Sequence, residues 1–549
     1  MRIAADLLFT DLPGPADMRA WDAAAFASYG MPPAVMMENA AKAALDELQT
    51  RRPLQGNERI LVVMGKGNNG GDGAAMARML HDEGHRVLVC ATTNLSALPH
   101  PAAEHVEAAK RFGVPFVCAT GDTWPPLPED FSRPHIVIDA LTGTGLSGQL
   151  RPRELAFVQA INGFAQSSFI LALDSPSGLC GESGHPLPDA VRATLTVAFE
   201  APVRGLYIGR GSEFCGEIVT RRVGMPLALR AHSNCWRLLA PKAHSAFCPA
   251  ATRHKGQAGR VLVIGGSQGM IGAPCLAALG ALRAGCGLTH LAVPGALCLQ
   301  AQSARPEFMV HPVGTGAQLT EHDIQELERL VKTLAPHALV LGPGLGRNKD
   351  GAAVVRALLS LQTRPPVICD ADALFFLATP KTSKKQSAHA LHTLLRPDDI
   401  ITPHPGEAAR LLPESFYTSV KQQAAMPDAA AKIALVQQLR PAALEALQQL
   451  LPSVIILKGP NTLIGQNKER VVLAPYVVAA LGVGGSGDVL GGAVAALVAG
   501  GMPSFEAACL GAHLHGRAGT LLARKTPVGH LATDIANAIP LAWSELCPS

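Results

Sequence analysis

The 549-residue sequence has no uninterrupted strongly apolar segment of about 20 residues, the length with which an α-helix spans a bilayer. Residues 1–11 are interrupted by acidic side chains, and they lack the apolar region and cleavage pattern of a secretory signal. We therefore expect no membrane partner and a cytoplasmic location.

The sequence also lacks a cysteine framework and a dense basic block. Its 12 cysteines form no C-x-x-C pair, and several lie in apolar runs, such as Cys90, Cys275 and Cys369. This pattern favours reduced thiols in the core over disulfides. The net charge of +4 is small for this length, and Lys and Arg cluster only weakly, at residues 381–385. We therefore expect no nucleic-acid partner.

The chain is longer than one hydrophobic core usually organises, which predicts two large domains. Short β-branched or apolar runs alternate with helical stretches from residue 59 to 199, and again from 261 to 457. This alternation predicts parallel sheets with crossover helices. The pattern is lost between 226 and 251. We predict an α/β chain with a Rossmann-like αβα domain at residues 1–235 and a second αβα domain at residues 236–549.

The first glycine-rich turn, residues 65–73, follows the apolar run 60–64. Glycines let main-chain N–H groups approach a phosphate, and the following helix adds the positive end of its dipole, so the turn predicts an anion site. It matches G-x-G-x-x-G. However, the second strand runs into residues 91–94 without the acidic residue of an NAD-binding dehydrogenase. Lys66 is not followed by Ser or Thr, which excludes a P-loop.

Two further predicted strands of this half end in polar residues, one at Asp139 and one at Asp174. Ligands in open parallel sheets bind at the carboxyl ends of the strands. We therefore expect Asp139 and Asp174 to converge with Asn69 and Ser177. The alternative is that the two aspartates only cap helices or turns.

The segments Asn68–Asp72, Asp139–Gly145 and Asp174–Gly178 resemble the NAD(P)H-hydrate epimerase family, over residues 15–230. The resemblance implies that Asp174 is the acid/base and that K⁺ is held by Asn69, Asp139 and Ser177. Their oxygens are the hard ligands that such a cation prefers. The substrate-binding residues that it implies are Asn68, Asn69, Gly70, Gly71, Asp72, Gly143, Thr144, Gly145, Leu146, Ser147, Gly148, Gln149 and Asp174.

One position departs from this family. Within Ala201–Leu206, where Ala-Pro-Lys-Pro-Gly-Leu is usual, Val203 takes the place of the lysine and Arg204 follows it. Arg204 is one candidate for the missing charge, but a guanidinium has a far higher pKa and does not donate a proton in the same way. Two hypotheses therefore stay open for this half: an epimerase, or a binding module that keeps the pocket without turnover.

The second glycine-rich turn, Gly484–Asp488, opens a helical run in the other half. An acid beside glycine N–H groups suits deprotonation of a hydroxyl next to a terminal phosphate, with Asp488 as the base. The alternative is a buried, N-capped helix whose glycines allow close packing. Other predicted strands end at Gly342–Gly346, at His404 between two prolines, and at Lys458–Thr462. These positions predict further contacts at the same edge of the sheet.

The segment 370–374 contributes Asp370 and Asp372, whose carboxylates are expected to reach Mg²⁺ through water. With 254–256, 265–274 and 531–534, these segments resemble the ADP-dependent NAD(P)H-hydrate dehydratase family of ribokinase-like fold, over residues 245–542.

This second resemblance implies catalysis by Asp488 with Mg²⁺, and ADP or ATP as co-substrate. The substrate-binding residues that it implies are Ala273, Gly344, Gly346, His404 and Asp488. The nucleotide-binding residues that it implies are Lys458, Gly459, Pro460, Asn461, Thr462 and Gly487. Val483 stands where the family often has a hydroxyl or small residue.

Together the two halves resemble the bifunctional NAD(P)H-hydrate repair enzymes. The resemblance implies an isomerase that interconverts the R and S forms of hydrated NADH or NADPH. It also implies a lyase that phosphorylates the S form and eliminates phosphate to restore NAD(P)H. We expect a homo-oligomer. The alternative is a ribokinase-like kinase of a vitamin or sugar, fused to a non-catalytic nucleotide-binding domain.

Overall fold

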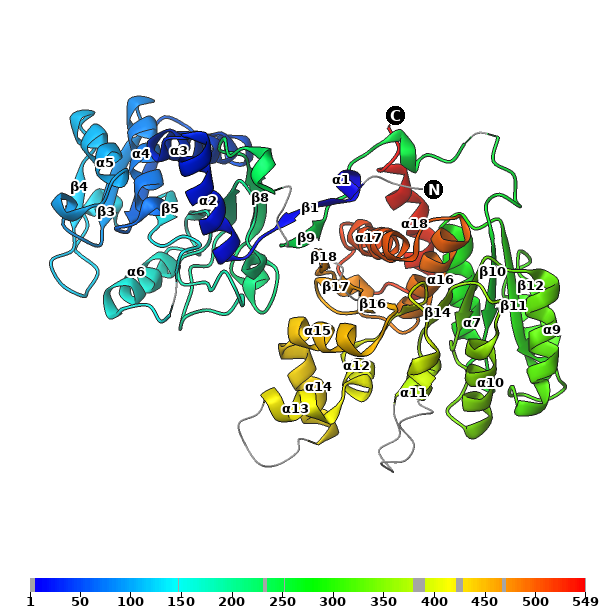
Figure 1. The fold of residues 1–549 in the computed structure, drawn as a ribbon. Coiled ribbons are helices and arrows are strands. Elements are labelled where there is room, and N and C mark those ends of the chain that lie inside the picture. Colours follow the sequence, from blue (N-terminus) through cyan, green and yellow to red (C-terminus); the bar gives the residue numbers. More distant parts are fainter. Residues whose placement is uncertain are drawn as a thin grey trace. The chain divides into compact units, whose positions relative to one another are not determined.

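The computed structural model describes residues 5–146, 148–230, 235–250, 252–378, 391–420, 428–466 and 471–548. It divides the chain into two compact units (Figure 1). The N-unit contains residues 11–236, and the C-unit contains residues 5–10 together with those from 237 onward. The N-terminal residues thus differ from expectation, because β1 (Phe9–Leu12) lies beside β9 (Trp236–Leu239) at the edge of the C-unit sheet.

The N-unit contains a seven-stranded parallel sheet in the order β4-β3-β2-β5-β6-β7-β8. Its strands are β2 (Arg59–Met64), β3 (Arg86–Ala91), β4 (Phe116–Cys118), β5 (Ile136–Ala140), β6 (Phe169–Leu173), β7 (Leu195–Phe199) and β8 (Glu217–Arg221). Its helices are α2 (Pro15–Tyr29), α3 (Pro33–Arg51), α4 (Asn68–Asp82), α5 (Ala102–Arg111) and α6 (Pro152–Gly163). One core packs α3, α4 and α5 on the sheet and another packs α6, which makes three layers.

The C-unit contains an eleven-stranded sheet in the order β1-β9-β18-β17-β16-β15-β14-β13-β10-β11-β12. From β16 to β12 neighbouring strands are parallel, whereas β17 is antiparallel to both of its neighbours. The strands not yet given are β10 (Arg260–Ile264), β11 (Leu288–Pro294), β12 (Met309–Val313), β13 (Ala338–Leu341), β14 (Val367–Cys369), β15 (Ile400–Ile401), β16 (Val454–Leu457), β17 (Thr462–Gly465) and β18 (Val472–Ala474).

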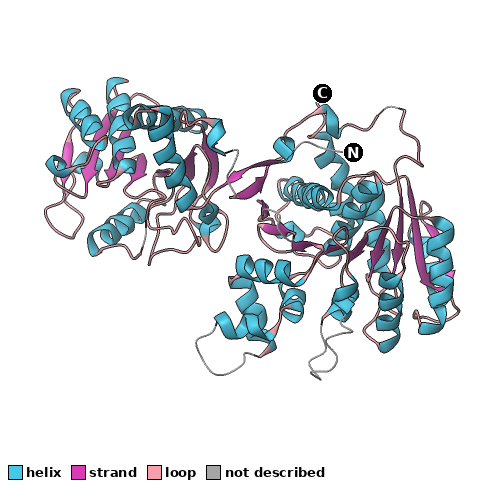
Figure 2. Ribbon diagram, in the orientation of Figure 1, coloured by secondary structure: helices cyan, strands magenta, loops and turns pink. Residues whose placement is uncertain are grey.

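Helices accompany both sheets (Figure 2). Those of the C-unit are α1 (Ala5–Leu8), α7 (Gly272–Arg283), α8 (Cys298–Ala304), α9 (Ile324–Leu334), α10 (Lys349–Ser360), α11 (Asp372–Leu377), α12 (Pro405–Leu411), α13 (Glu414–Val420), α14 (Ala429–Gln438), α15 (Arg440–Leu450), α16 (Ser486–Ala499), α17 (Ser504–Ala523) and α18 (Ala532–Ser544). The α/β class predicted from the alternating pattern is confirmed.

The seven parallel strands of the N-unit, and the parallel strands from β16 to β12 in the C-unit, each reverse their strand order once. The reversal lies between β2 and β5 in the N-unit and between β10 and β13 in the C-unit. In both places the loops after the two strands touch. A Cβ atom on Gly65 would lie 1.9 Å from the Leu141 carbonyl oxygen, and one on Gly265 would lie 2.2 Å from that of Pro343. Only glycine fits these contacts, and crevices at such reversals are where open sheets bind ligands.

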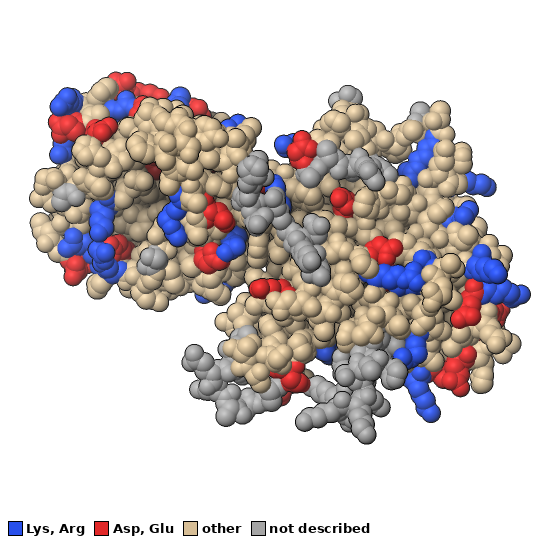
Figure 3. Space-filling model, viewed as in Figure 1, with Lys and Arg blue, Asp and Glu red and all other residues tan. Residues whose placement is uncertain are grey.

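Charged side chains of both signs are dispersed among uncharged residues on the face shown in Figure 3. Within the described part of the chain, every helix is too short or too polar to cross a bilayer.

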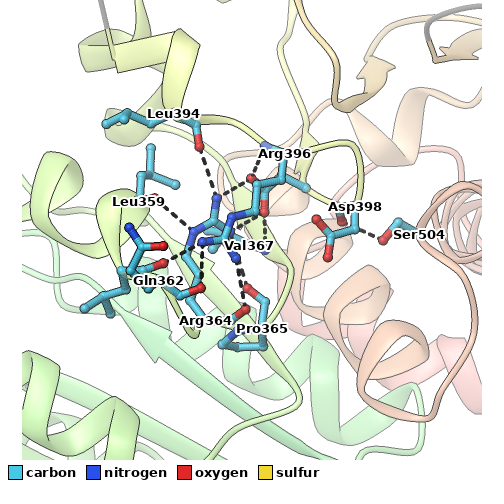
Figure 4. Close-up of polar contacts among 11 residues, drawn as sticks. Leu359, Gln362, Arg364, Pro365, Val367, Leu394, Arg396, Asp398 and Ser504 are labelled. Carbon is cyan, nitrogen blue, oxygen red and sulfur yellow. Dashed lines mark hydrogen bonds and ion pairs between the residues drawn. The ribbon is translucent and has the colours of Figure 1, made fainter. Parts of the chain in front are cut away.

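A buried ion pair fixes the amino ends of three C-unit strands (Figure 4). The Arg364 guanidinium donates two hydrogen bonds of 2.6 Å to Asp399, and both side chains are fully buried. Asp399 also accepts from the backbone N–H groups of Val367 and Arg396, and its carbonyl accepts from Val454. The pair therefore connects the beginnings of β14, β15 and β16, whose far ends carry polar residues of the candidate site.

Replacing Arg364 with Met leaves the Asp399 carboxylate buried without its counter-charge. We expect the free energy of unfolding of the C-unit to fall by about 3–5 kcal/mol. Hydrogen exchange measured by mass spectrometry on peptides from β14 and β15 should show the loss of protection. Arg329→Met, at a side chain that is 76% exposed, is the matched control and should leave exchange unchanged. Equal protection in Arg364→Met and wild type would contradict this prediction.

Candidate functional site

A cavity of about 680 Å³ lies at the strand reversal of the N-unit. The predicted residues that line it are Asn68, Asn69, Asp72, Gly143, Thr144, Gly145, Leu146, Gln149 and Asp174. Three predicted residues do not line it: Gly70, Gly71 and Gly148. Gly70 and Gly71 instead allow close packing, because Cβ atoms there would lie 2.1 Å from the Gly65 carbonyl oxygen and 2.4 Å from the Met37 sulfur. Ser147 lies outside the described residues.

Asp139 and Ser177 do not line this cavity but are hydrogen-bonded to each other. The Ser177 hydroxyl donates to Asp139 at 2.6 Å, and the Ser177 N–H donates to the other carboxylate oxygen at 2.8 Å. The Thr142 N–H donates to the Ser177 hydroxyl oxygen at 2.8 Å, which connects the pair to the loop after β5. Burial raises the pKa of Asp139 to about 6, although the bonds from Ser177 and Leu141 oppose the rise.

Asn69 and Asp174 flank the same glycine. A Cβ atom on Gly143 would lie 3.0 Å from a carboxylate oxygen of Asp174 and 3.4 Å from the Asn69 side chain. Both polar atoms of the Asn69 amide are buried without a hydrogen-bond partner. Orphaned buried amides in native proteins call for a ligand, because leaving them unpaired costs about 1–3 kcal/mol. The amide oxygen is therefore suited to hold a cation.

Asp174 occupies a strained backbone position at the end of β6. Its φ of 64° lies in the left-handed region, which is uncommon outside glycine and often marks functional loops. Its carboxylate accepts from the Thr144 N–H at 3.1 Å. Burial raises its pKa, and bonds from Thr144 and Phe199 oppose the rise. A carboxyl with a raised pKa at the edge of a cavity is suited to transfer protons.

Two more carboxyls lie close enough to Asp174 for its charge to affect their pKa values. The pKa of Asp72 rises well above its usual value, first through burial and then through Asp174 and Asp22. Asp22, on α2, also lines the cavity, and burial and Asp174 raise its pKa to about 6. The sequence pattern did not single out Asp22, since its helix precedes the sheet and carries no motif.

Neither residue at the departure from the epimerase pattern lines the cavity. Val203 is only 1% exposed and packs against Met18 and Trp21 in a hydrophobic core. Arg204 forms an ion pair with Glu182, and its guanidinium lies 5.3 Å from the centre of the Trp236 ring. Arg204 is therefore engaged elsewhere and does not replace the missing lysine in the cavity.

In the C-unit, contacts between neighbouring loops bring the predicted segments together at the carboxyl ends of β10, β13, β14, β15 and β16. The Ser267 hydroxyl donates to the Gly344 carbonyl at 2.8 Å, and the Gly346 N–H donates to Asp372 at 2.9 Å. The Lys458 N–H donates to the Pro403 carbonyl at 2.8 Å. The loops from residues 267 to 458 thus form one continuous surface along this edge of the sheet.

Lys458 lies at the centre of this surface, among three carboxyls. Its Nζ is 2.9 Å from Asp370 and 3.8 Å from Glu407. A Cβ atom on Gly487, in the first turn of α16, would lie 3.0 Å from the same Nζ. Burial lowers the pKa of Lys458, but Asp370, Glu407 and Asp488 raise it overall. Lys458 is thus held as a cation next to the second glycine turn.

Asp488 lies in that first turn with a strongly perturbed carboxyl. Burial raises its pKa to about 8, Asp370 adds to the rise and Lys458 opposes it. The N-terminus of α16 contributes unpaired N–H groups and the positive end of the helix dipole. The site therefore combines a base whose pKa lies near neutrality with an anion-binding helix end.

A buried histidine fixes the start of α16. His515 Nε2 lies 3.0 Å from both the carbonyl oxygen and the hydroxyl of Ser486. A carbonyl only accepts, so Nε2 carries the proton. Burial lowers the pKa of His515 to about 4, which keeps the ring neutral. His515 was not predicted, because it comes from α17 and meets the turn only in the folded chain.

The predicted nucleotide segment is a tight connection between β16 and β17. Gly459 and Asn461 both have positive φ, and the Thr462 hydroxyl donates to the Gly459 carbonyl at 3.0 Å. Arg440 donates to the carbonyls of Leu457, Pro460 and Asn461. Arg440 was not predicted either, since nothing in its local sequence connects it to this turn.

His404 and Asp372 have partners that restrict their roles. His404 caps α12: its Nδ1 accepts from the Gly406 N–H at 3.0 Å, and its N–H donates to Glu407 at 2.8 Å. Its side chain remains 53% exposed. Asp372 accepts from the Gly346 N–H and from Arg347, so it organises the glycine loop.

Ala273 is half-buried in the first turn of α7 and donates to the Met270 carbonyl.

Removing the charge of Lys458 should destabilise the C-unit in a pH-dependent way. Lys458 lowers the pKa of Asp370 below its usual value, a contribution to stability that is present above the unfolded pKa and is lost as the pH falls. We expect Lys458→Met to lower the free energy of unfolding by about 3–5 kcal/mol at neutral pH, and by less in acid. Urea unfolding at several pH values measures this. Lys332→Met, at an exposed position, is the control. An equal loss at every pH would refute the electrostatic origin.

Both units match models of known protein families. Residues 261–541 match the family model described as NAD(P)H-hydrate dehydratase, and residues 33–205 match the model described as YjeF-related protein N-terminus. The chain is 34% identical to a bifunctional NAD(P)H-hydrate repair enzyme of Coxiella burnetii, over 91% of this chain and 93% of the relative. It is 33% identical to one of Moorella thermoacetica, over 97% and 96%.

Among solved structures, the C-unit resembles an ADP/ATP-dependent NAD(P)H-hydrate dehydratase of Bacillus subtilis that was co-crystallised with ATP and Mg²⁺. The identity is 26%, over 55% of this chain and 94% of the other, with a TM-score of 0.42.

Proposed function

We propose a two-step repair reaction for this chain, which belongs to the family of bifunctional NAD(P)H-hydrate repair enzymes. The family gives the chain an epimerase-like N-terminal domain and a dehydratase C-terminal domain. In our proposal the N-unit, an isomerase, interconverts the R and S forms of hydrated NADH and NADPH. The C-unit, a lyase, dehydrates the S form at the expense of ADP or ATP. A cytoplasmic location agrees with the 12 free cysteines.

The observation that carries the dehydratase proposal is the placement of Asp488 in the first turn of α16, within the electrostatic range of Lys458. Hydroxide is a poor leaving group, so the hydrate's hydroxyl must be modified before it leaves. Asp488 takes the hydroxyl proton as the oxygen attacks the terminal phosphate of the nucleotide. The N–H groups of Gly485 and Gly487 and the Lys458 ammonium stabilise the developing negative charge. Elimination of phosphate then restores NAD(P)H.

Ala273, Gly344, Gly346 and His404 are proposed to hold the hydrate, and Gly487 with the Lys458–Thr462 segment to hold the nucleotide. The described residues contain no group of three or more His, Cys, Asp or Glu side chains able to hold a metal. Asp370 and Glu407 nevertheless offer the hard oxygens that Mg²⁺ prefers, and phosphates and water commonly complete its shell. Bound Mg²⁺ would neutralise phosphate charge. Asp372, paired with Gly346 and Arg347, is less suited than Glu407.

Asp488→Asn should abolish the proposed reaction. Wild-type protein mixed with hydrated NADH and ADP or ATP should restore the near-ultraviolet absorbance of the dihydronicotinamide. We expect the variant to be at least about 100-fold slower, because the base is lost. For wild type, kcat/KM should rise with pH toward about 8 as Asp488 ionises. Glu307→Gln, an exposed charge neutralisation, is the control. Absence of recovery with wild type and both nucleotides would refute the proposal.

The kinase alternative is not favoured by the family matches. It makes a different prediction in the same assay, since a kinase would accumulate a stable phosphorylated product. Mass spectrometry of the reaction mixture distinguishes that product from restored NADH and free phosphate.

In the N-unit we propose that Asp174 is an acid/base and that K⁺ binds near Asn69, Asp139 and Ser177. The residues fit this ion, because the Asn69 amide is buried without a partner and the donors are carboxylate, amide and hydroxyl oxygens. Bound K⁺ would position the phosphate or ribose end of the hydrate by electrostatic attraction. Asp139 would hold Ser177 and the loop after β5 in place.

Potassium should therefore stabilise the N-unit. Each kcal/mol of binding energy raises the melting temperature of a domain of this size by about 2–4 °C. We expect such a rise for wild type in KCl relative to choline chloride at equal ionic strength, measured by thermal denaturation. Asn69→Ala should remove the difference, whereas Asn57→Ala, in an exposed turn, should retain it. Equal melting of wild type in both salts would contradict a potassium site.

A further inference from the structure

The proposed epimerisation requires two proton-transferring groups at the N-unit cavity. Moving a hydroxyl from one face of a ring carbon to the other requires a proton to be delivered on one face and removed on the other. Asp174 supplies one such group. The position that carries a lysine in the epimerase pattern is Val203, which is buried in a hydrophobic core, and Arg204 pairs with Glu182.

Four other acidic residues line the cavity: Asp22, Asp72, Glu154 and Glu200. Glu200 is engaged, because it accepts from the N–H groups of Val223 and Met225 and pairs with Arg222 and Arg230. Asp22 and Asp72 are within the electrostatic range of Asp174. Asp72 lies in the buried first turn of α4 and is only 9% exposed.

Asp22 is the most exposed of the four, because Asp72 and Glu200 are buried and Glu154 is partly buried. Met18, Arg19, Asp22 and Phe26 all line the cavity, and their spacing places them on one face of α2. Asp22 therefore reaches the cavity from a helix, whereas Asp174 reaches it from the end of a strand. A substrate held by the loops after β2 and β5 would have a carboxyl from each of two separate elements.

We propose that Asp22 is the second proton-transferring residue of the N-unit and acts together with Asp174 on the bound hydrate. This inference rests on the proposed epimerase function. The protonated member of the pair gives its proton to the hydroxyl, the C–O bond breaks, and water leaves while the ring carries the positive charge. A water on the other face then forms a new C–O bond to the same carbon and gives a proton to the ionised member.

The step balances, because one water leaves, one enters and the two carboxyls exchange protonation states. A pair of this kind needs one protonated and one ionised carboxyl at the same pH. Neighbouring carboxylates that line one cavity favour such mixed states, since each charge disfavours ionisation of the next.

The test uses the full chain without adenine nucleotide, so that the C-unit cannot consume the S form. Conversion of purified R-form NADPH hydrate to the S form is followed by chromatography. We expect Asp22→Asn to slow the conversion about 100-fold, with little change in the Kd of the same hydrate. Asp22→Glu should retain part of the rate. Asp82→Asn, an exposed change on α4, should match wild type.

A second measurement tests the written step. In ¹⁸O-labelled water, wild-type protein should place ¹⁸O in the S form as fast as it forms, because the original hydroxyl leaves. Full activity of Asp22→Asn, or conversion without ¹⁸O uptake, would overturn the inference while leaving the epimerase function intact. If Asp22→Asn is fully active and Lys66→Met or Asp72→Asn loses the conversion, the second proton-transferring residue is Lys66 or Asp72 and not Asp22. Wild-type protein that binds the hydrate without converting it would refute the epimerase function and the inference together.

Discussion

The glycine contact at each strand reversal is the constraint on which both sites depend. Gly65 lies against Leu141, and Gly265 lies against Pro343, at distances that exclude any side chain. Because the two loops touch, the residues that follow these contacts along each loop lie close together in space. In one unit Asp174 and Asn69 flank Gly143, and Asp139 and Ser177 are bonded to the preceding Thr142 or to each other; in the other unit the loops that lead to Lys458 converge. A methyl side chain at either glycine would push the two loops apart and would disrupt the site that they form.

The two sites use buried carboxyls in opposite electrostatic settings. In the C-unit, Asp370, Glu407 and Asp488 surround the Lys458 ammonium, so one cation offsets part of the carboxyl charge before any ligand arrives. In the N-unit, burial and then the charge of Asp174 raise the pKa values of Asp22 and Asp72, and Asp22 adds to the rise for Asp72. A negatively biased cavity of this kind favours a cation or shared protons. This contrast fits phosphoryl transfer in one unit and proton transfer in the other.

The sequence was sufficient to predict the α/β class, most parallel strands, the position of Asp174 at a strand end and that of Asp488 at the start of a helix. Buried parallel strands are continuous apolar runs, and glycine turns mark where they end. The sequence was not sufficient to identify the site residues Asp22, Glu407, Arg440 and His515. Tertiary packing sets their partners, and no local sequence pattern indicates that packing. The pairing of β1 with β9 was missed for the same reason, since the two segments are remote in the chain.

That pairing has a consequence for biosynthesis. Ribosomes deliver β1 first, then the whole N-unit, and only afterwards β9 and the rest of the C-unit sheet. The N-unit is in effect an insertion between adjacent strands of its neighbour, and domains generally fold as they emerge. The leading strand must therefore stay unpaired until more than two hundred further residues have been made. Because Phe9–Leu12 is a short strand, it exposes few unpaired backbone groups with which another strand could pair wrongly before β9 is made.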